Sequence, residues 1–298
     1  MAHIEDYGFL GVAGDVLSMT SPPGRGLLNG VEIQCAVLGG TCEVMAQSRA
    51  VKAFGEAMRA GPSVGHGGMS EAPSIQSLTD RVLMNDLPCE VDGRPVLGVG
   101  STSLSALPFD PRGSFVVTGP SGSGRSTSLA SLARSLHRWS SAMMLYLVTP
   151  RRSSELAALP DWTEVTAGTD DIVAFVTRLQ GELLEGAHPG PMTVVVERMD
   201  DLAGTVAESP LSGLLKVCLD HARFVVAEGE TTFFSSSFGL PGLLKTSRSG
   251  LALQPDGLEG QMVFRSSFPA FNQAGQPEGR GFLVQRGRPE MLQVALPG

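Results

Sequence analysis

The sequence predicts an α/β fold, with a mainly parallel sheet covered by helices on both faces and a C-terminal β-hairpin. From residue 114 onward, short runs that are apolar throughout alternate with segments whose apolar residues recur at helical spacing. Strands that are apolar on both faces are typical of parallel sheets, because helices cover such sheets from both sides. A glycine-rich loop joins the first of these strands to the first helix, at the edge where α/β sheets bind ligands.

Five strands and three helices make up the alternating pattern. The strands are expected at residues 115–118, 144–148, 193–196, 224–227 and 251–253. The helices are expected at residues 125–137, 170–184 and 211–221, each with its apolar side chains on one face. Short strands between residues 95 and 108 are expected to cover the entry to the core.

The loop after the first strand has the pattern of a phosphate-binding loop. Its residues are Gly119, Pro120, Ser121, Gly122, Ser123, Gly124, Arg125, Ser126 and Thr127. Glycines at this spacing let consecutive backbone N–H groups surround the phosphates of a nucleotide, and the following helix directs its positive N-terminal end at the same anion. The loop therefore predicts a RecA-like P-loop NTPase fold that binds ATP, with Mg²⁺ held by the hydroxyl of Ser126 or Thr127.

Arg125 stands where such loops carry lysine. Arginine keeps the charge, but its planar fork differs from a compact ammonium, so the exchange is not conservative beside a closely packed phosphate. The chain also favours arginine throughout, since only three of its 22 basic residues are lysine. Two explanations stay open: a functional change in the loop, or drift within an arginine-rich composition.

The second half of a P-loop site is an acidic residue at the end of a later strand, usually followed by a second acid that polarises the attacking water. Glu197 follows strand 193–196 and is the candidate catalytic residue and Mg²⁺ ligand. Arg198 replaces the second acid and cannot act as a base, because arginine stays protonated. Asp200 and Asp201 are expected to cap the next helix. Together with Arg125, these departures predict weak or absent hydrolysis.

Two more stretches belong to the neighbourhood of this site. Glu228 and Glu230 leave strand 224–227, where a polar residue often senses the γ-phosphate. Arg248 precedes the last strand of the core and is a candidate phosphate sensor, acting either here or on the nucleotide of a neighbouring module. The alternative for Arg248 is an arginine exposed in a turn.

A sequence pattern that occurs near both ends of the chain predicts a tandem array. Residues 22–28 and residues 277–283 share Pro-x-Gly-Arg-Gly followed by two apolar residues, and each precedes a second strand-like stretch, as in a β-hairpin. The two arginines, at 25 and 280, are 255 positions apart, which is the length of a P-loop module. We therefore expect residues 1–40 to be the terminal hairpin of a preceding module, residues 41–74 to be a helix and a Gly/Pro/Ser-rich linker, and residues 75–298 to be a degenerate P-loop ATPase module that ends the array.

Composition limits the classes of function. The 298 residues are 42% hydrophobic and 17% charged, as in an ordinary globular protein. A net charge of −8 disfavours nucleic acid as a partner, since binding to phosphate backbones requires a basic surface. No apolar run reaches the roughly 20 residues of a membrane span. The four cysteines lack metal-site spacing and are expected to be free, mostly buried thiols.

Three stretches of the chain resemble the FtsK/SpoIIIE family of P-loop motors, and more closely the tandem downstream modules of type VII secretion ATPases of the EccC/EssC type. They are residues 117–126, residues 247–256 and the hairpin around residues 279–295. The resemblance covers about residues 75–298. It implies a cytoplasmic module of a membrane-anchored motor that forms a homo-oligomer only in the full-length protein. It also implies contacts with other ATPase modules of the same polypeptide and with the tail of a secreted protein.

These observations lead to one main hypothesis and two alternatives. The main hypothesis is a module that binds ATP and Mg²⁺ statically or weakly and acts in regulation or substrate docking during protein transport. The first alternative is a DNA-translocating motor domain, which the acidic net charge disfavours. The second is a nucleotide-free scaffold in which the guanidinium of Arg125 fills the phosphate position itself.

Overall fold

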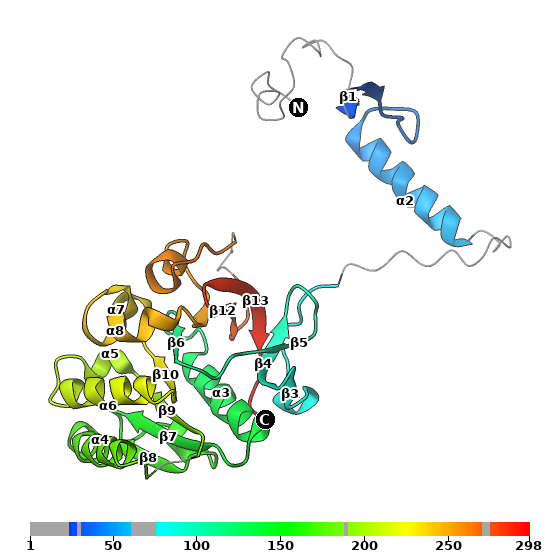
Figure 1. The fold of residues 1–298 in the computed structure, drawn as a ribbon. Coiled ribbons are helices and arrows are strands. Elements are labelled where there is room, and N and C mark those ends of the chain that lie inside the picture. Colours follow the sequence, from blue (N-terminus) through cyan, green and yellow to red (C-terminus); the bar gives the residue numbers. More distant parts are fainter. Residues whose placement is uncertain (1–23, 29–30, 61–75, 188–189, 270–274) are drawn as a thin grey trace. The chain divides into compact units, whose positions relative to one another are not determined.

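The computed structural model describes residues 24–28, 31–60, 76–187, 190–269 and 275–298, and the chain divides into two compact units, Met1–Ser74 and Ile75–Gly298 (Figure 1). In the first unit, β1 (Arg25–Leu28) pairs antiparallel with β2 (Val31–Gln34), which is the β-hairpin that the repeated Pro-x-Gly-Arg-Gly pattern predicts. The predicted helix is α2 (Val44–Ala60). Residues 1–23 of the expected terminal hairpin segment and the predicted linker at residues 61–74 lie outside the described residues.

In the described part of the second unit, eleven strands form one mixed sheet. Its order is β3–β4–β13–β12–β11–β6–β10–β9–β7–β8, with β5 paired to β4. The strands are β3 (Glu90–Val91), β4 (Arg94–Gly100), β5 (Ala106–Pro108), β6 (Ser114–Thr118), β7 (Met144–Thr149), β8 (Glu164–Ala167), β9 (Met192–Val196), β10 (Phe224–Glu228), β11 (Gly250–Leu253), β12 (Arg280–Gln285) and β13 (Arg288–Val294).

The parallel half of the sheet confirms the predicted strands. Strands β11, β6, β10, β9, β7 and β8 all run in one direction. Strand β8 was not predicted: it lies at the edge of the sheet and has only four residues, of which Thr166 alone is buried. The C-terminal hairpin is confirmed, and β12 pairs antiparallel with β11 while β13 pairs antiparallel with β4. The short strands before the core thus join the same sheet.

Helices cover both faces of this sheet (Figure 1). The helix α3 packs against one face, and its Leu129, Leu132 and Leu136 are fully buried there. The others contribute to the core on the opposite face. The helices are α3 (Arg125–Trp139), α4 (Thr169–Leu184), α5 (Met199–Leu202), α6 (Glu208–Asp220), α7 (Thr231–Ser235) and α8 (Gly239–Leu244). Short 3₁₀ turns are η1 (Met84–Asp86), η2 (Leu156–Ala158) and η3 (Lys245–Ser247), and η4 (Gly260–Phe264) is a π turn.

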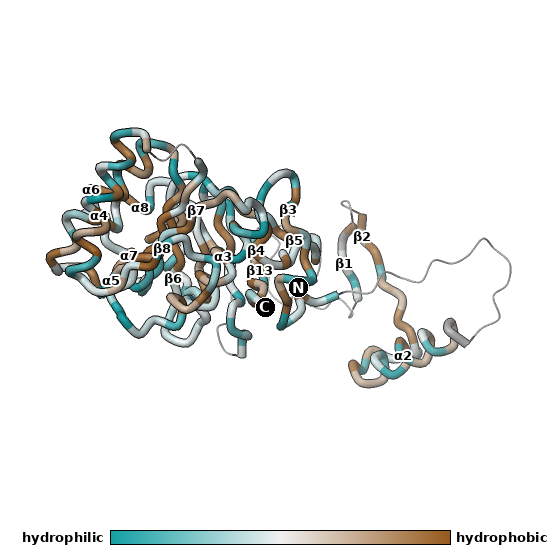
Figure 2. Tube along the Cα trace, turned by 90° about the horizontal axis from the view of Figure 1, so that it is seen from below, coloured by the Kyte–Doolittle hydropathy of each residue, from teal (hydrophilic) through white to brown (hydrophobic). Residues whose placement is uncertain are grey.

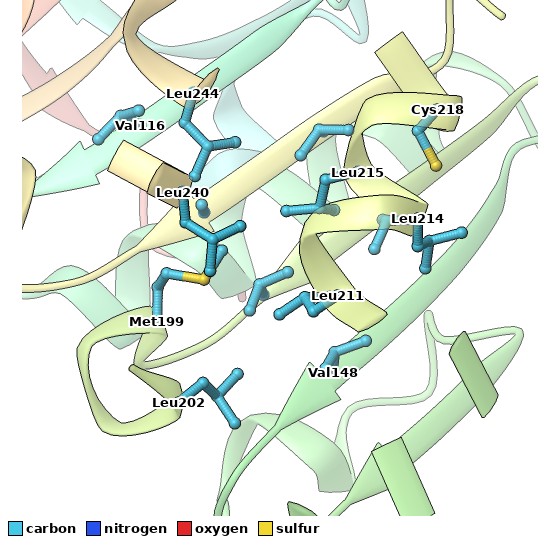
Figure 3. Packing of buried hydrophobic residues seen from close by; sticks show 14 of the residues in the cluster. Val116, Val148, Met199, Leu202, Leu211, Leu214, Leu215, Cys218, Leu240 and Leu244 are labelled. Carbon is cyan, nitrogen blue, oxygen red and sulfur yellow. The ribbon is translucent and has the colours of Figure 1, made fainter. Parts of the chain in front are cut away.

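The central strands send alternate residues to the two sides of the sheet. Val116 packs in the core under α6 and α8, whereas its neighbours Phe115 and Val117 pack in the core under α3. Figure 2 shows hydrophobic residues gathered along the strands, and Figure 3 shows Leu211, Leu214 and other residues of the first core between helix and sheet. Such two-sided burial fixes the register of each strand, because a shift by one residue would exchange the two faces.

The structure bears on membrane-spanning helices and on the burial of the cysteines. In the described residues, no helix has both the length and the apolar composition needed to cross a membrane. The prediction of mostly buried thiols is wrong, because Cys35, Cys42 and Cys89 are exposed. Only Cys218 is buried, and burial raises the pKa of its thiol to about 12.

Candidate functional site: a phosphate-binding loop with engaged side chains

The glycine-rich loop lies where β6 ends and α3 begins, at the edge formed by the carboxyl ends of the parallel strands. Because β10 and β11 flank β6, the segments that follow these two strands border the loop on either side. The backbone N–H of Gly279, just before β12, donates to the carbonyl oxygen of Ser123 at 3.1 Å. The C-terminal hairpin therefore helps to hold the loop in place.

The backbone of the loop requires glycine at three positions. Gly119, Gly122 and Gly124 have φ angles of 152°, 80° and 93°. A Cβ atom on Gly119 would lie 2.7 Å from the carbonyl oxygen of Leu253, so β11 leaves no room for a side chain there. Gly122 has no neighbouring atom within 4 Å of such a Cβ. The sequence pattern thus produces the open, curled backbone that surrounds phosphates in P-loops.

Three unpartnered polar atoms point to an anion at this loop. Among the described residues, five buried side-chain atoms have no hydrogen-bond partner, and three of them, Ser123 Oγ, Arg125 Nη1 and Ser128 Oγ, belong to the loop or the first turn of α3. Buried donors are normally satisfied by protein, water or ligand. The N-terminus of this 15-residue helix adds a favourable field for negative charge. These residues therefore fit the phosphate groups of ATP.

Arg125 makes an ion pair that the sequence did not predict. Its Nε lies 3.1 Å from Glu228 Oε1, and the two side chains are only 10% and 2% exposed. The other carboxylate oxygen of Glu228 accepts a hydrogen bond from the backbone N–H of Arg198 at 2.8 Å. Burial raises the pKa of Glu228, while the Arg198 N–H and the charge of Arg125 oppose the rise. The residue in the lysine position is thus held by an acid at the end of β10.

Glu197 lies at the end of β9, as predicted, and its carboxylate is partly occupied. Ser154 Oγ donates to Glu197 Oε2 at 2.6 Å, and the residue is 6% exposed. Its other oxygen has no hydrogen-bond partner among the described residues. Ser126 and Thr127 lie in the first turn of α3, and both are exposed. Glu197 with the Ser126 hydroxyl would be the hard oxygen ligands that Mg²⁺ prefers.

Arg198 and the two aspartates form a separate cluster. Arg198 has a left-handed backbone, with φ 50° and ψ 56°, and precedes α5. Its guanidinium donates to both carboxylate oxygens of Asp201, which lowers the pKa of that carboxyl. The prediction that Asp200 and Asp201 cap the next helix is wrong. They lie inside α5, because this helix already begins at Met199, directly after Arg198. The next helix, α6, begins after Ala207 and has no side-chain cap.

Arg248 lies at the opposite edge of the sheet from the loop. It precedes β11, whose first residue, Gly250, is in register with Val116 of β6, whereas the loop follows Thr118 at the other end. Arg248 lines a cavity of about 220 Å³ together with Lys245 and Arg265. Its placement does not bring it to the phosphates of its own loop, and its action on a neighbouring module stays a prediction.

A second cavity beside the loop contains residues that sequence reasoning missed. It has a volume of about 350 Å³, and its lining includes Gly119, Ser121 and the buried Glu259. Thr118 Oγ1 donates a short hydrogen bond to Glu259 Oε1, and burial raises the pKa of Glu259. The only sequence signal was an acidic residue shortly after the last parallel strand. Such a signal has little specificity without the fold that places it under the loop.

Solved structures share the fold of this chain. The cytoplasmic domain of the type VII secretion ATPase EccC from Thermomonospora curvata superposes with a TM-score of 0.64 at 19% identity, over 92% of this chain and 34% of that one. EssC from Geobacillus thermodenitrificans (ATPases 2 and 3) superposes with a TM-score of 0.60 at 15% identity, over 98% of this chain and 58% of that one. This chain has the fold of a type VII secretion ATPase domain.

A two-ATPase structure of Thermomonospora curvata EccC, solved with a signal sequence peptide, matches equally well, with a TM-score of 0.64 over 53% of its length. The monomer form of the conjugation coupling protein TcpA with ATPγS matches less well, with a TM-score of 0.51. No protein-family profile and no curated protein matches the sequence. The chain spans about a third of the EccC cytoplasmic domain and just over half of the EssC structure.

Proposed function

We propose that this chain is a nucleotide-binding P-loop module of a type VII secretion-like motor that hydrolyses ATP weakly or not at all. In this proposal, it acts in regulation or in docking a secreted substrate. The observation that carries nucleotide binding is the group of unpartnered buried atoms, Ser123 Oγ, Arg125 Nη1 and Ser128 Oγ, at the N-terminus of α3. ATP phosphates would satisfy these donors together with the backbone N–H groups of the loop.

The part of the proposal that concerns weak or absent hydrolysis is based on the acidic residues around the loop. Three carboxylates at the ends of β9 and β10 are engaged by other protein groups: Glu197 by Ser154, Asp201 by Arg198 and Glu228 by Arg125. Residue 198, which follows the metal-side acid, is an arginine and cannot activate a water molecule. A static site would bind Mg²⁺ through Ser126 and Glu197, and the ion would neutralise phosphate charge without a base positioned beside it.

The proposal places the module in a tandem array. Residues 75–298 are three quarters of the chain, yet EccC and EssC align with 92% and 98% of it, so the alignments continue into the first unit. This agrees with residues 1–40 ending a preceding module. By analogy with these cytoplasmic domains, the partners would be other ATPase modules of the same polypeptide and the tail of a secreted protein. The module would be the cytoplasmic part of a membrane-anchored protein that oligomerises only at full length.

Calorimetry with ATP·Mg²⁺, combined with phosphate release in the same sample, tests the proposal. Binding without release of phosphate is the expected result. Rapid release of phosphate would contradict the static site. The absence of binding at millimolar ATP would contradict nucleotide binding and favour the nucleotide-free scaffold, in which the ion pair of Arg125 and Glu228 replaces the ligand. Tight, salt-sensitive binding of duplex DNA would favour the DNA-translocating alternative.

A further inference from the structure

We propose that Glu228 sets the nucleotide affinity of the loop by competing with phosphate for the guanidinium of Arg125. The inference rests on the proposed nucleotide binding and names a determinant of that same site. A lysine in this position would extend into the loop toward the phosphates. Here the arginine lies against the end of β10 instead, and its Nε is 3.1 Å from Glu228 Oε1.

The ion pair is incomplete on the side of the arginine. The ion pair joins Nε to Glu228 Oε1, and Nη1 of the same guanidinium is buried without a hydrogen-bond partner. An arginine–carboxylate pair of full strength is bidentate, with two parallel N–H···O bonds. The second oxygen of Glu228 is engaged elsewhere, by the backbone N–H of Arg198. The guanidinium therefore has a buried, unsatisfied donor, which a phosphate oxygen would satisfy once the side chain turns toward the loop.

The burial of Arg125 and Glu228 makes each charge depend on its partner. Both side chains are at least nine-tenths buried, so neither charge is well solvated, and each depends on a partner of opposite sign. A phosphate group in the loop would supply a new partner for Arg125. Phosphate and the carboxylate of Glu228 then compete for the same guanidinium. A ligand with more negative charge near Arg125 competes better, so a triphosphate is favoured over a diphosphate.

Substitution of the carboxylate tests this competition. The variant Glu228→Gln keeps the shape of the side chain and an oxygen that accepts from the Arg198 N–H, but it releases Arg125. We expect the Kd for ATP·Mg²⁺, measured by calorimetry on the purified 298-residue chain, to fall about tenfold, which corresponds to about 1.4 kcal/mol. The Kd for ADP·Mg²⁺ is expected to fall less. Glu228→Asp, which keeps the charge but shortens the side chain, is expected to have a smaller effect of the same sign.

Asp161→Asn is the matched control. Asp161 also pairs with an arginine of α3, since Arg134 Nη1 lies 2.8 Å from its Oδ1, and its side chain is 5% exposed. The control thus removes the buried carboxylate partner of another arginine in α3 without touching the loop. We expect it to leave the Kd for ATP·Mg²⁺ within twofold. Thermal unfolding of each variant identifies a protein that has lost its fold.

The double variant Arg125→Met/Glu228→Gln separates competition from simple repulsion. If Glu228 acts through Arg125, the double variant binds ATP·Mg²⁺ as Arg125→Met does; a further tightening would overturn the inference. If the wild-type protein binds ATP·Mg²⁺ and Glu228→Gln leaves the Kd unchanged or raises it, the inference is overturned, while the proposed function stays in place. If Glu228→Gln binds ATP·Mg²⁺ and the wild-type protein does not, the inference is supported, and Glu228 keeps Arg125 from the nucleotide in the wild-type protein. Absence of binding by both proteins would overturn both proposals.

Discussion

The two halves of the candidate site differ in how closely they keep the geometry of a working P-loop. The loop between β6 and α3 has its three glycines in the required conformations and leaves buried donors without partners. The acidic half, at the ends of β9 and β10, has Glu197, Asp201 and Glu228 engaged by other side chains and an arginine at residue 198. One half thus keeps unsatisfied donors, and in the other half three carboxylates are already paired with protein groups.

The difference separates binding from catalysis. Phosphate binding in a P-loop depends mainly on backbone N–H groups, which every non-proline residue carries, and on glycines that allow the curl. Hydrolysis depends on the identity of a few side chains that hold Mg²⁺ and orient water. A chain can therefore exchange those side chains and still keep the loop. The following predictions test this separation, from the largest expected effect to the smallest.

The first prediction concerns the backbone of the loop. Gly119→Ala places a Cβ 2.7 Å from the carbonyl oxygen of Leu253 at a φ of 152°, so the loop must move away from β11. We expect the Kd for ATP·Mg²⁺ to rise at least about a hundredfold, equal to about 2.7 kcal/mol. Calorimetry measures the change.

Gly122→Ala is the control for this prediction, because it also has a positive φ but no atom within 4 Å of the added Cβ. We expect a rise of about fivefold, from backbone strain of about 1 kcal/mol. Equal effects of the two substitutions would show that contact with β11 does not shape the loop.

The second prediction concerns the metal. If Glu197 supplies a ligand to Mg²⁺ through its oxygen that Ser154 does not occupy, Glu197→Gln should weaken binding of ATP in the presence of Mg²⁺ by about tenfold, or about 1.4 kcal/mol. Binding of ATP with EDTA present should change by less than twofold. An equal loss in both conditions would remove Glu197 from the metal site.

The third prediction concerns the buried acid under the loop. Burial raises the pKa of Glu259 above its ordinary value of 4.5, so its contribution to stability is present below 4.5 and is lost as the pH rises through the folded pKa. Glu259→Gln should therefore raise Tm at neutral pH by roughly 2 °C. The gain should shrink as the pH falls toward 4.5. A difference in Tm that is independent of pH, measured by calorimetric scans, would contradict a buried titrating carboxyl.

The smallest effect is expected from restoring the lysine. Arg125→Lys should leave phosphate release at the background level, because Arg198 still replaces the second acid. A coupled phosphate assay at saturating ATP measures the rate. Vigorous turnover by this single variant would show that Arg125 alone blocks hydrolysis and that the acidic half is competent.

The sequence predicted the parallel strands because their apolar runs are long and continuous, but it missed β8. That strand has only four residues, of which Thr166 alone is buried, so it offers no apolar run to detect. It also misplaced Asp200 and Asp201 as a helix cap, because the short α5 starts directly after Arg198 adopts a left-handed conformation. Local patterns identify an element better than its first residue.

By itself, the sequence determined the fold class, the phosphate-binding loop and the two departures at Arg125 and Arg198, because each depends on residue type and spacing within a short segment. Only the tertiary structure decided which side chains meet. The pair of Arg125 and Glu228 joins residues 103 positions apart in the chain. The short contact of Thr118 with Glu259 spans 141 positions. Such contacts follow from the order of strands in the sheet, which places β10 and β11 on either side of β6, and no local pattern encodes that order.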